Sequence, residues 1–326
     1  MKGALGVIGA GAWGTALAQV AAANGHEVRL WARDPALVDA INAGHENAAY
    51  LPGIPLSAAI RATGDLAWVA DAAANLIVTP AQAMRAVLAQ LPANGQALVV
   101  CAKGIEAGTH RLMSEVAQEQ HPASAVLVLS GPTFAHEVAR GLPTAVTLAG
   151  HDAATRALLA AAIAAPHFRP YATGDVIGAE IGGAVKNVLA IACGVVDGAG
   201  LGQNARAALI ARGFAEMTRF GLAKGARAGT LAGLSGLGDL VLTCSSTASR
   251  NFSLGVGIGQ GRAAADLLAN RRTVAEGAFT APVLLEAAQA AGVEMPITAA
   301  VCRLLEGAAV RGVIDDLLAR PLKEEV

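Results

Sequence analysis

The glycine pattern GAGAWG at residues 9–14 constrains the fold of this chain more than any other feature. It follows an apolar segment at 4–8 and opens a helical run at 15–23, and a second strand-like segment spans 27–31. This order of strand, glycine turn, helix and strand is typical of a dinucleotide-binding βαβ unit, in which the helix N-terminus attracts the phosphates. The alternative is a glycine turn in a βαβ unit that binds no ligand.

Further apolar segments alternate with helical ones in the first half of the chain. They predict strands at 75–78, 97–101, 125–129, 144–148 and 168–171. Several are apolar without interruption, as parallel strands covered on both faces are. We therefore predict a doubly wound α/β sheet of the Rossmann type over residues 1–178, which would be the NAD(P)-binding domain.

The pattern changes after about residue 178, where helical periodicity continues and strand signals nearly vanish. The predicted helices span 179–197, 204–224, 252–268, 280–291 and 296–308. An all-α C-terminal domain at 179–326, expected to bind the substrate and carry catalytic residues, accounts for this half.

Composition excludes several classes of partner. The net charge is −1 and no basic run occurs, so nucleic acid is not an expected partner. Without an apolar run of about 18 residues, we expect no integral membrane segment. The four cysteines lie far apart and form no zinc-like cluster, so we predict reduced thiols, no metal and a cytoplasmic location.

The end of the second strand bears on the choice of cofactor. An NAD-specific site usually carries an acid there, whereas this chain has Arg33 followed by Asp34. Arg33 can stack on adenine or meet a 2′-phosphate, which favours NADP or dual use. Asp34 can instead cap a helix, because Pro35 suits the first helical turn.

Two of the five lysines lie in apolar or small-residue surroundings. Lys103 follows the predicted strand 97–101 at the sheet edge where ligands bind, and Lys186 follows Gly182 and Gly183 on a predicted helix. A pair of glycines inside a helix indicates close approach of another backbone or a ligand. Unlike arginine, lysine can lose its proton, so both are candidates for proton transfer; the alternative is two surface lysines.

Two loops contain further polar side chains that could bind a ligand. The segment 130–135, SGPTFA, follows a predicted strand, and the segment 236–251 combines Asp239 and Thr243 with the tripeptide Ser249-Arg250-Asn251. Arginine with serine and asparagine donors suits a phosphate. The alternatives are a proline turn for the first loop and a solvated loop with helix caps for the second.

Taken together, these segments resemble the NAD(P)-dependent glycerol-3-phosphate dehydrogenases of bacteria and archaea, over nearly the whole chain. The segments that match are 9–14, 103–104, 130–135, 184–188, 236–240, 249–251 and 276–277. Thr133 stands where the family often has serine. The resemblance implies reversible reduction of dihydroxyacetone phosphate to sn-glycerol 3-phosphate with NADPH or NADH, NADPH being favoured, in supply of glycerophospholipid synthesis. A homodimer is compatible with it.

The resemblance also implies the site residues. It makes Lys186 the proton donor and acceptor, with Lys103 and Asp239 as further catalytic groups. The implied substrate-binding residues are Lys103, Gly131, Thr133, Lys186, Asn187, Asp239, Thr243, Ser249, Arg250 and Asn251. The implied cofactor-binding residues are Gly9, Gly11, Ala12, Trp13, Gly14, Arg33, Lys103, Ala135, Arg250, Val274 and Glu276.

Two other functions are also compatible with the dinucleotide-binding pattern. A β-hydroxyacid or ketopantoate dehydrogenase has a similar domain arrangement, but Ser249-Arg250-Asn251 favours a phosphorylated substrate over these. A non-catalytic NADP-sensing protein would keep the glycine pattern without needing Lys186 or Asp239.

Overall fold

A computed structural model describes residues 3–269 and 275–321 of the chain. The chain forms two compact units, the first from Met1–Gly183 with Ala226–Asp239, the second from Ala184–Gly225 with Leu240–Val326. The first unit therefore extends past residue 178, where the domain boundary was expected. The segment Ala226–Asp239, expected in the helical domain, belongs to the first unit as well.

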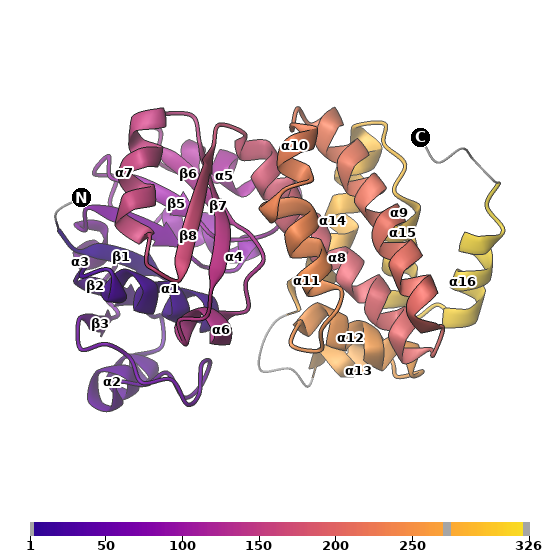
Figure 1. The fold of residues 1–326 in the computed structure, drawn as a ribbon, viewed down its shortest axis with the longest axis horizontal. Helices are drawn as coiled ribbons and strands as arrows, with labels where there is room; N and C mark the ends of the chain where they lie inside the picture. Colours follow the sequence, from indigo (N-terminus) through magenta and orange to yellow (C-terminus); the bar gives the residue numbers. More distant parts are fainter. Residues whose placement is uncertain (1–2, 270–274, 322–326) are drawn as a thin grey trace. The chain divides into compact units, whose positions relative to one another are not determined.

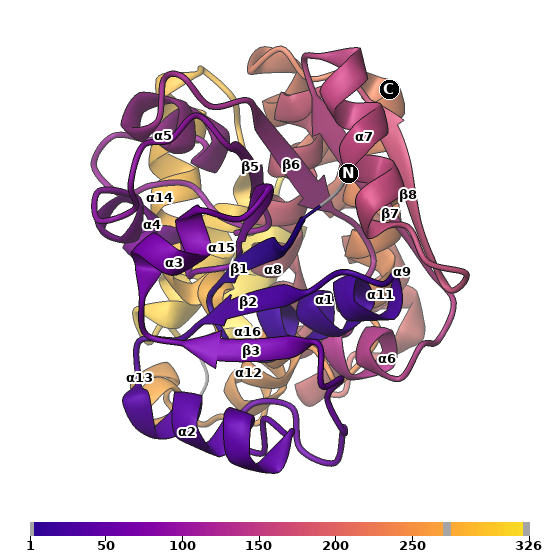
Figure 2. The same ribbon diagram turned by 90° about the vertical axis from the view of Figure 1, so that its left-hand side faces the viewer.

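The first unit is built on one eight-stranded sheet with the order β3-β2-β1-β4-β5-β6-β7-β8 (Figures 1 and 2). The strands are β1 (Leu5–Ile8), β2 (Val28–Trp31), β3 (Ile60–Thr63), β4 (Ala74–Ile77), β5 (Ala97–Val100), β6 (Val126–Ser130), β7 (Thr144–Gly150) and β8 (Phe168–Thr173). All neighbours pair in parallel except β6 and β7. The doubly wound sheet predicted from the sequence is confirmed.

Alternate residues of the central strands face two separate apolar clusters, one on each side of the sheet. In β1, Leu5 and Val7 belong to one cluster and Ile8 to the other. In β4, Leu76 and Ile77 divide in the same way. Because side chains alternate between the two faces of a strand, a strand covered on both faces must be apolar throughout. The uninterrupted apolar segments of the sequence have this cause.

Seven helices of the first unit connect its strands, and two further helical segments of this unit follow β8 in the sequence. They are α1 (Ala12–Ala23), α2 (Pro35–Gly44), α3 (Leu66–Ala70), α4 (Ala81–Leu88), α5 (Met113–Gln120), α6 (Ala135–Ala139), α7 (Ala153–Ile163), α10 (Ala228–Leu231) and the π-helical turn η1 (Leu234–Gly238). Figure 2 shows α2 beyond β3, whose outer edge it covers. There Asn42 Nδ2 donates to the Ala62 carbonyl at 3.0 Å, and the Ala62 N–H donates to Asn42 Oδ1 at 2.9 Å. An amide side chain thus replaces a neighbouring strand.

The second unit is helical throughout the part that the structure describes (Figure 1). Helix α8 (Val176–Gly198) begins in the first unit and α11 (Asp239–Thr243) starts at its last residue; both continue into the second unit. The others are α9 (Gly202–Ala223), α12 (Arg250–Gly259), α13 (Ala264–Ala269), α14 (Glu276–Ala290), α15 (Pro296–Leu305) and α16 (Val310–Leu318). The single helix expected at 252–268 was wrong: it divides into α12 and α13, because the chain turns at Gly261 with a φ of 86°.

Backbones of α8 and α12 approach closely in the second unit. A Cβ atom added to Gly194 would lie 2.1 Å from the Phe252 carbonyl oxygen, and one added to Gly255 would lie 2.0 Å from that of Ile191. Glycine is required at both positions. The contact fixes the N-terminal residues of α12 against the middle of α8.

Helix α8 is also long and apolar enough to cross a membrane by length and composition. Within the described residues it is the one helix that meets this test, and 94% of its apolar window is buried inside the fold. It carries three charged residues, Glu180, Lys186 and Asp197. Burial of this kind is what a core helix of a folded domain shows.

Two buried glutamates were not anticipated from the sequence. Glu180 of α8 accepts hydrogen bonds from the backbone N–H, at 2.7 Å, and the hydroxyl of Ser114 in the first turn of α5. Glu216 of α9 accepts from the Ile297 N–H at 2.7 Å in the first turn of α15. Each carboxyl group therefore caps the N-terminus of another helix, where the helix dipole favours an acceptor.

Burial raises the pKa of each of these two carboxyl groups to about 7, against the hydrogen bonds that lower it. Because the folded state then binds a proton that the unfolded chain has lost, stability is largest below about pH 4.5 for these groups and falls as pH rises through 7. Between about pH 5 and about pH 8 the free energy of unfolding should fall by about 1 to 3 kcal/mol less in Glu180→Gln than in the parent chain. Urea unfolding at the two pH values measures this difference. An unchanged pH slope in this variant would contradict the assignment.

Candidate active site

The glycine loop connects β1 to α1 as the sequence predicted. Gly9 has a φ of 118°, and a Cβ added there would lie 2.8 Å from the Val78 carbonyl oxygen. A Cβ on Gly14 would lie 1.8 Å from the Gly9 carbonyl oxygen, so the first turn of α1 packs directly on the loop. These two glycines are needed for the turn and for the packing of helix on strand.

The same loop fits a dinucleotide phosphate by two further observations. A Cβ on Gly11 would meet nothing within 4 Å, so this glycine leaves open space at the N-terminus of α1 beside Ala12. Trp13 carries a buried indole Nε1 with no hydrogen-bond partner among the described residues. Open space beside free helix N–H groups, together with an orphaned donor, is what a bound pyrophosphate would use.

The residues after β2 are an exposed arginine, Arg33, and an acid, Asp34, whose side chain is engaged in capping a helix. Arg33 is exposed directly after the strand. Asp34 is the N-cap of α2, with its carboxylate accepting from the Ala36 N–H at 3.0 Å and Pro35 in the first turn. The helix-cap alternative for Asp34 is therefore confirmed, and its carboxylate is already engaged.

Successive parallel strands place polar residues along one edge of the sheet. In the spatial order β2, β1, β4, β5 and β6, the residues that follow or end the strands are Arg33, the loop 9–14, Thr79, Lys103 and Ser130. The carboxyl edge of an open α/β sheet is where ligands bind. Thr79 and Ser130 carry buried hydroxyl oxygens without a hydrogen-bond partner in the described structure. Ser130 belongs to the segment 130–135 that the sequence had indicated, whereas Thr79 was not anticipated.

Lys103 and Asp239 form an ion pair inside the first unit. Lys103 Nζ lies 2.7 Å from Asp239 Oδ2, and it donates to the Gly131 carbonyl at 3.4 Å. The Asp239 side chain is fully buried and that of Lys103 is 14% exposed. A buried carboxylate needs such a partner, so Asp239 fixes the position of the Lys103 amine.

The loop after β6 holds Gly131, Thr133 and Ala135. Gly131 packs tightly, since a Cβ there would lie 2.9 Å from the Val146 Cα. The Thr133 hydroxyl donates to the Gly131 carbonyl at 3.3 Å, and Ala135 begins α6, which packs on α1. The loop thus brings a hydroxyl next to the carbonyl that Lys103 also contacts.

Lys186 lies in the second unit, in the interior of α8. Only 6% of this residue is exposed, and its Nζ donates to the Thr243 hydroxyl at 3.0 Å. A buried amine of this kind can change protonation during a reaction more easily than an exposed one. The alternative of a snorkelling surface lysine is wrong for Lys186.

Asn187, next to Lys186, starts a chain of hydrogen bonds in the same unit. Asn251 Nδ2 donates to Asn187 Oδ1 at 2.9 Å, and the Gly277 N–H donates to Asn251 Oδ1 at 3.0 Å. This chain links α8 to the first turns of α12 and α14, where Arg250 and Glu276 lie. Helix termini and a guanidinium together favour an anionic ligand.

Ser249 is the N-cap of α12, where its hydroxyl accepts from the Phe252 N–H at 3.2 Å. The helix-cap alternative for this serine is therefore confirmed. Arg250, the next residue, is exposed. The expected cofactor residue Val274 lies outside the described residues.

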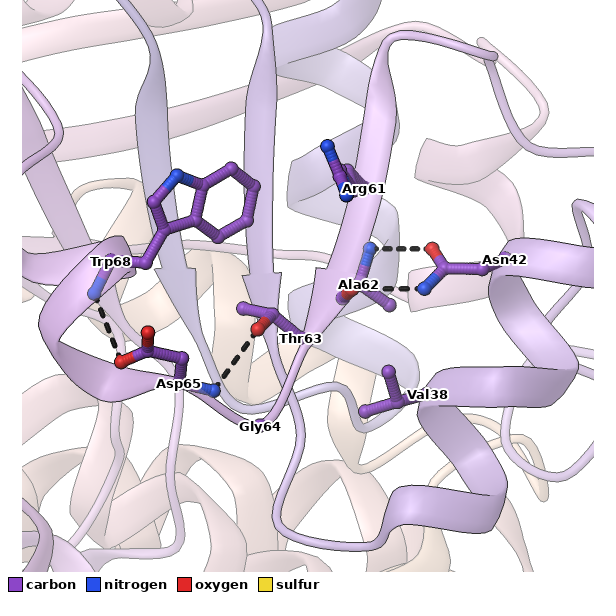
Figure 3. Close-up of a pocket in the computed structure, with 8 residues that line it drawn as sticks. All are labelled: Val38, Asn42, Arg61, Ala62, Thr63, Gly64, Asp65 and Trp68. Carbon is purple, nitrogen blue, oxygen red and sulfur yellow. Dashed lines mark hydrogen bonds between the residues drawn. The ribbon is translucent and has the colours of Figure 1, made fainter.

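A polar pocket of about 360 Å³ lies elsewhere in the first unit, between α2, β3 and α3 (Figure 3). Its polar side chains serve local structure: Asn42 binds the backbone of β3, Thr63 accepts from the Asp65 N–H, and Asp65 caps α3. Arg61 lies over the Trp68 ring at 5.6 Å. This pocket contains none of the predicted site residues.

The fold and these side chains define a dehydrogenase that uses a nicotinamide dinucleotide. A family model for the N-terminus of NAD-dependent glycerol-3-phosphate dehydrogenase matches residues 4–156, and one for the C-terminus matches residues 175–314. The chain belongs to this family, as its resemblance predicted. It is accordingly an NAD(P)-dependent oxidoreductase.

Individual relatives agree over their full length. A protein from Erythrobacter litoralis named glycerol-3-phosphate dehydrogenase [NAD(P)+] is 62% identical over 325 residues, covering 100% of this chain and 98% of the relative. One of the same name from Sphingopyxis alaskensis is 61% identical, covering 98% and 97%. The crystal structure of glycerol-3-phosphate dehydrogenase from Coxiella burnetii has a TM-score of 0.93 at 38% identity, covering 98% of this chain and 99% of that one.

Proposed function

We propose that this chain catalyses the reversible reduction of dihydroxyacetone phosphate to sn-glycerol 3-phosphate, with NADPH as the preferred reductant. The observation that carries the proposal is the group of polar residues in the second unit: a buried amine at Lys186, the amides of Asn187 and Asn251, and Arg250 at a helix N-terminus. The group provides a proton donor and a phosphate-binding cation. Relatives named glycerol-3-phosphate dehydrogenase support the substrate.

The reaction needs a proton where negative charge develops. Bound NADPH supplies the hydride, and reduction of a ketone leaves charge on its oxygen. We assign Lys186 as the group that donates a proton to this oxygen and takes it back in the reverse direction. Thr243, bonded to its amine, orients Lys186 for this role.

Lys103 has a different task in the proposal. Its amine is held by Asp239 and by the Gly131 carbonyl, which leaves it ordered and paired. A fixed positive charge at the carboxyl edge of β5 stabilises developing negative charge without reorganising. Thr133, beside Gly131, would add a hydroxyl donor to the substrate.

The substrate phosphate is assigned to the first turn of α12. Arg250 offers several donors to one phosphate, and Asn251 lies beside it on the same turn. Ser249 contributes by capping this helix, which orders the turn. Incubation with dihydroxyacetone phosphate and NADPH tests the whole proposal: one sn-glycerol 3-phosphate should form per NADPH oxidised, and a different product would contradict it.

The preference for NADPH follows from the end of β2. The Asp34 carboxylate is hydrogen-bonded as the cap of α2, and the guanidinium of Arg33 next to it is exposed and offers donors to a 2′-phosphate. We expect Arg33→Ala to raise the KM for NADPH by about 10- to 100-fold and to change that for NADH little. Initial rates with each cofactor measure both constants.

A matched control for this prediction is Arg61→Ala, which removes an arginine from the pocket of Figure 3 in the same unit. It should leave the KM for both cofactors unchanged. If Arg61→Ala weakened NADPH selectively and Arg33→Ala did not, the 2′-phosphate would belong in that pocket instead. The cytoplasmic location, the homodimer and the link to glycerophospholipid synthesis remain predictions from the sequence.

A further inference from the structure

Helix α8 contains two successive glycines whose surroundings differ. A Cβ added to Gly182 would lie 2.3 Å from the Ser235 carbonyl oxygen and 2.8 Å from the Gly236 Cα, both in the backbone of η1. A Cβ added to Gly183 would lie 2.9 Å from the Ser130 hydroxyl oxygen. It would also lie 3.3 Å and 3.4 Å from Cγ and Cδ of Lys103.

Packing explains the first glycine but not the second. The atoms next to Gly182 belong to the backbone of η1 and cannot rotate aside, so any side chain at this position would force η1 away from α8. The neighbours of Gly183 are side-chain atoms of Ser130 and Lys103, which can rotate aside. Alanine is also the better helix former, so fold stability alone would favour it at position 183.

Both side chains would have to move. The Ser130 hydroxyl would move most, since it would lie 2.9 Å from the added Cβ, and the methylene carbons of Lys103 would move by a few tenths of an ångström although the Lys103 amine has fixed partners. Lys103 Nζ lies 2.7 Å from Asp239 Oδ2 and 3.4 Å from the Gly131 carbonyl oxygen. Its methylene carbons pass Gly183 on the way to these partners. Ser130, on the other side, has a buried hydroxyl without a hydrogen-bond partner in the described structure, so nothing anchors it there.

We propose that Gly183 is a positioning residue for the reaction: by having no side chain, it lets the methylene carbons of Lys103 lie where the amine reaches Asp239. The inference rests on the function proposed above, since it gives Lys103 a task in catalysis. Glycine makes helix α8 less stable than alanine would, and we attribute its presence at position 183 to the space that the Lys103 side chain needs.

The test is the variant Gly183→Ala. We expect kcat with dihydroxyacetone phosphate to fall by about 3- to 10-fold, because displacement of a catalytic group by about 1 Å costs about 10²-fold and the shift of Lys103 is a fraction of that. The Tm should stay equal or rise, and the KM for NADPH should stay within about twofold, since the glycine loop is untouched. The split between a lower kcat and an unchanged KM distinguishes this positioning role from a general loss of folding.

Gly312→Ala is the matched control, because Gly312 lies inside helix α16 and a Cβ there would meet nothing within 4 Å. Gly312→Ala should change the Tm by about as much as Gly183→Ala does, but its kcat should equal that of the parent chain. In the double variant Gly183→Ala with Ser130→Ala, compared with Ser130→Ala alone, the freed space should restore part of kcat.

Three results would overturn the inference: a kcat of Gly183→Ala within about twofold of the parent chain, a loss of kcat that follows a fall in Tm, or no recovery in the double variant. A parent chain that does not reduce dihydroxyacetone phosphate would instead refute the proposed function.

Discussion

Replacing Lys186 with alanine is expected to lower kcat by about 10²-fold or more while leaving NADPH affinity nearly intact. The amine is buried and bonded to the Thr243 hydroxyl in the second unit, whereas the glycine loop that fits the phosphates of the cofactor belongs to the first unit. Removing it therefore takes away the proton donor without changing that loop. Steady-state kinetics and a fluorescence titration with NADPH measure the two quantities separately.

Arginine should not restore activity at position 186, because its guanidinium does not release a proton in this pH range. Lys224→Ala, at the end of α9 in the same unit, is the matched control and should keep full turnover. Near-normal kcat in Lys186→Ala, or full activity in Lys186→Arg, would remove Lys186 from the proposed role.

The second large effect is expected from Arg250→Ala. This exposed arginine opens α12, and loss of its charged hydrogen bonds to a phosphate should reduce kcat/KM for dihydroxyacetone phosphate by about 10- to 100-fold. Turnover of unphosphorylated dihydroxyacetone, which we expect to be slow, should hardly change, because that substrate has no phosphate to contact Arg250. Comparing the two substrates in both proteins isolates the phosphate contact.

Arg262→Ala is the control here, since Arg262 is exposed just beyond the other end of α12. It should leave both substrates unaffected. If Arg250→Ala weakened only the cofactor, or affected both substrates equally, the phosphate would have to bind elsewhere.

Much of the fold could be predicted because its pattern is local. The loop 9–14 lies between β1 and α1 as expected, and strand-like segments, several of them apolar without interruption, marked seven of the strands. β3 (Ile60–Thr63) was not predicted because it is an edge strand in which the exposed Arg61 interrupts the buried residues. The break between α12 and α13 was missed although Gly259 and Gly261 signalled it, since apolar spacing continues across the turn.

The sequence predicted which residues belong to the site, but not which of them form hydrogen bonds or ion pairs with one another. Lys103 and Asp239 are 136 residues apart, and nothing local to either one reveals their ion pair. The glycine pair of α8 did predict close approach of a backbone, which η1 provides at Gly182. Glu180 could have been noticed as an acid within an apolar helix, but its partner at the start of α5 depends on the tertiary fold.

The most direct test of the central claim is the rate of NADPH oxidation by the purified chain, followed by absorbance, with three ketones in turn: dihydroxyacetone phosphate, ketopantoate and a β-keto acid. We expect rapid oxidation with dihydroxyacetone phosphate, and a kcat/KM for it at least about 10²-fold above those for the other two, which is the scale of a charged phosphate contact. Turnover of ketopantoate or the β-keto acid in preference, or NADPH binding without turnover of any of the three, would contradict it.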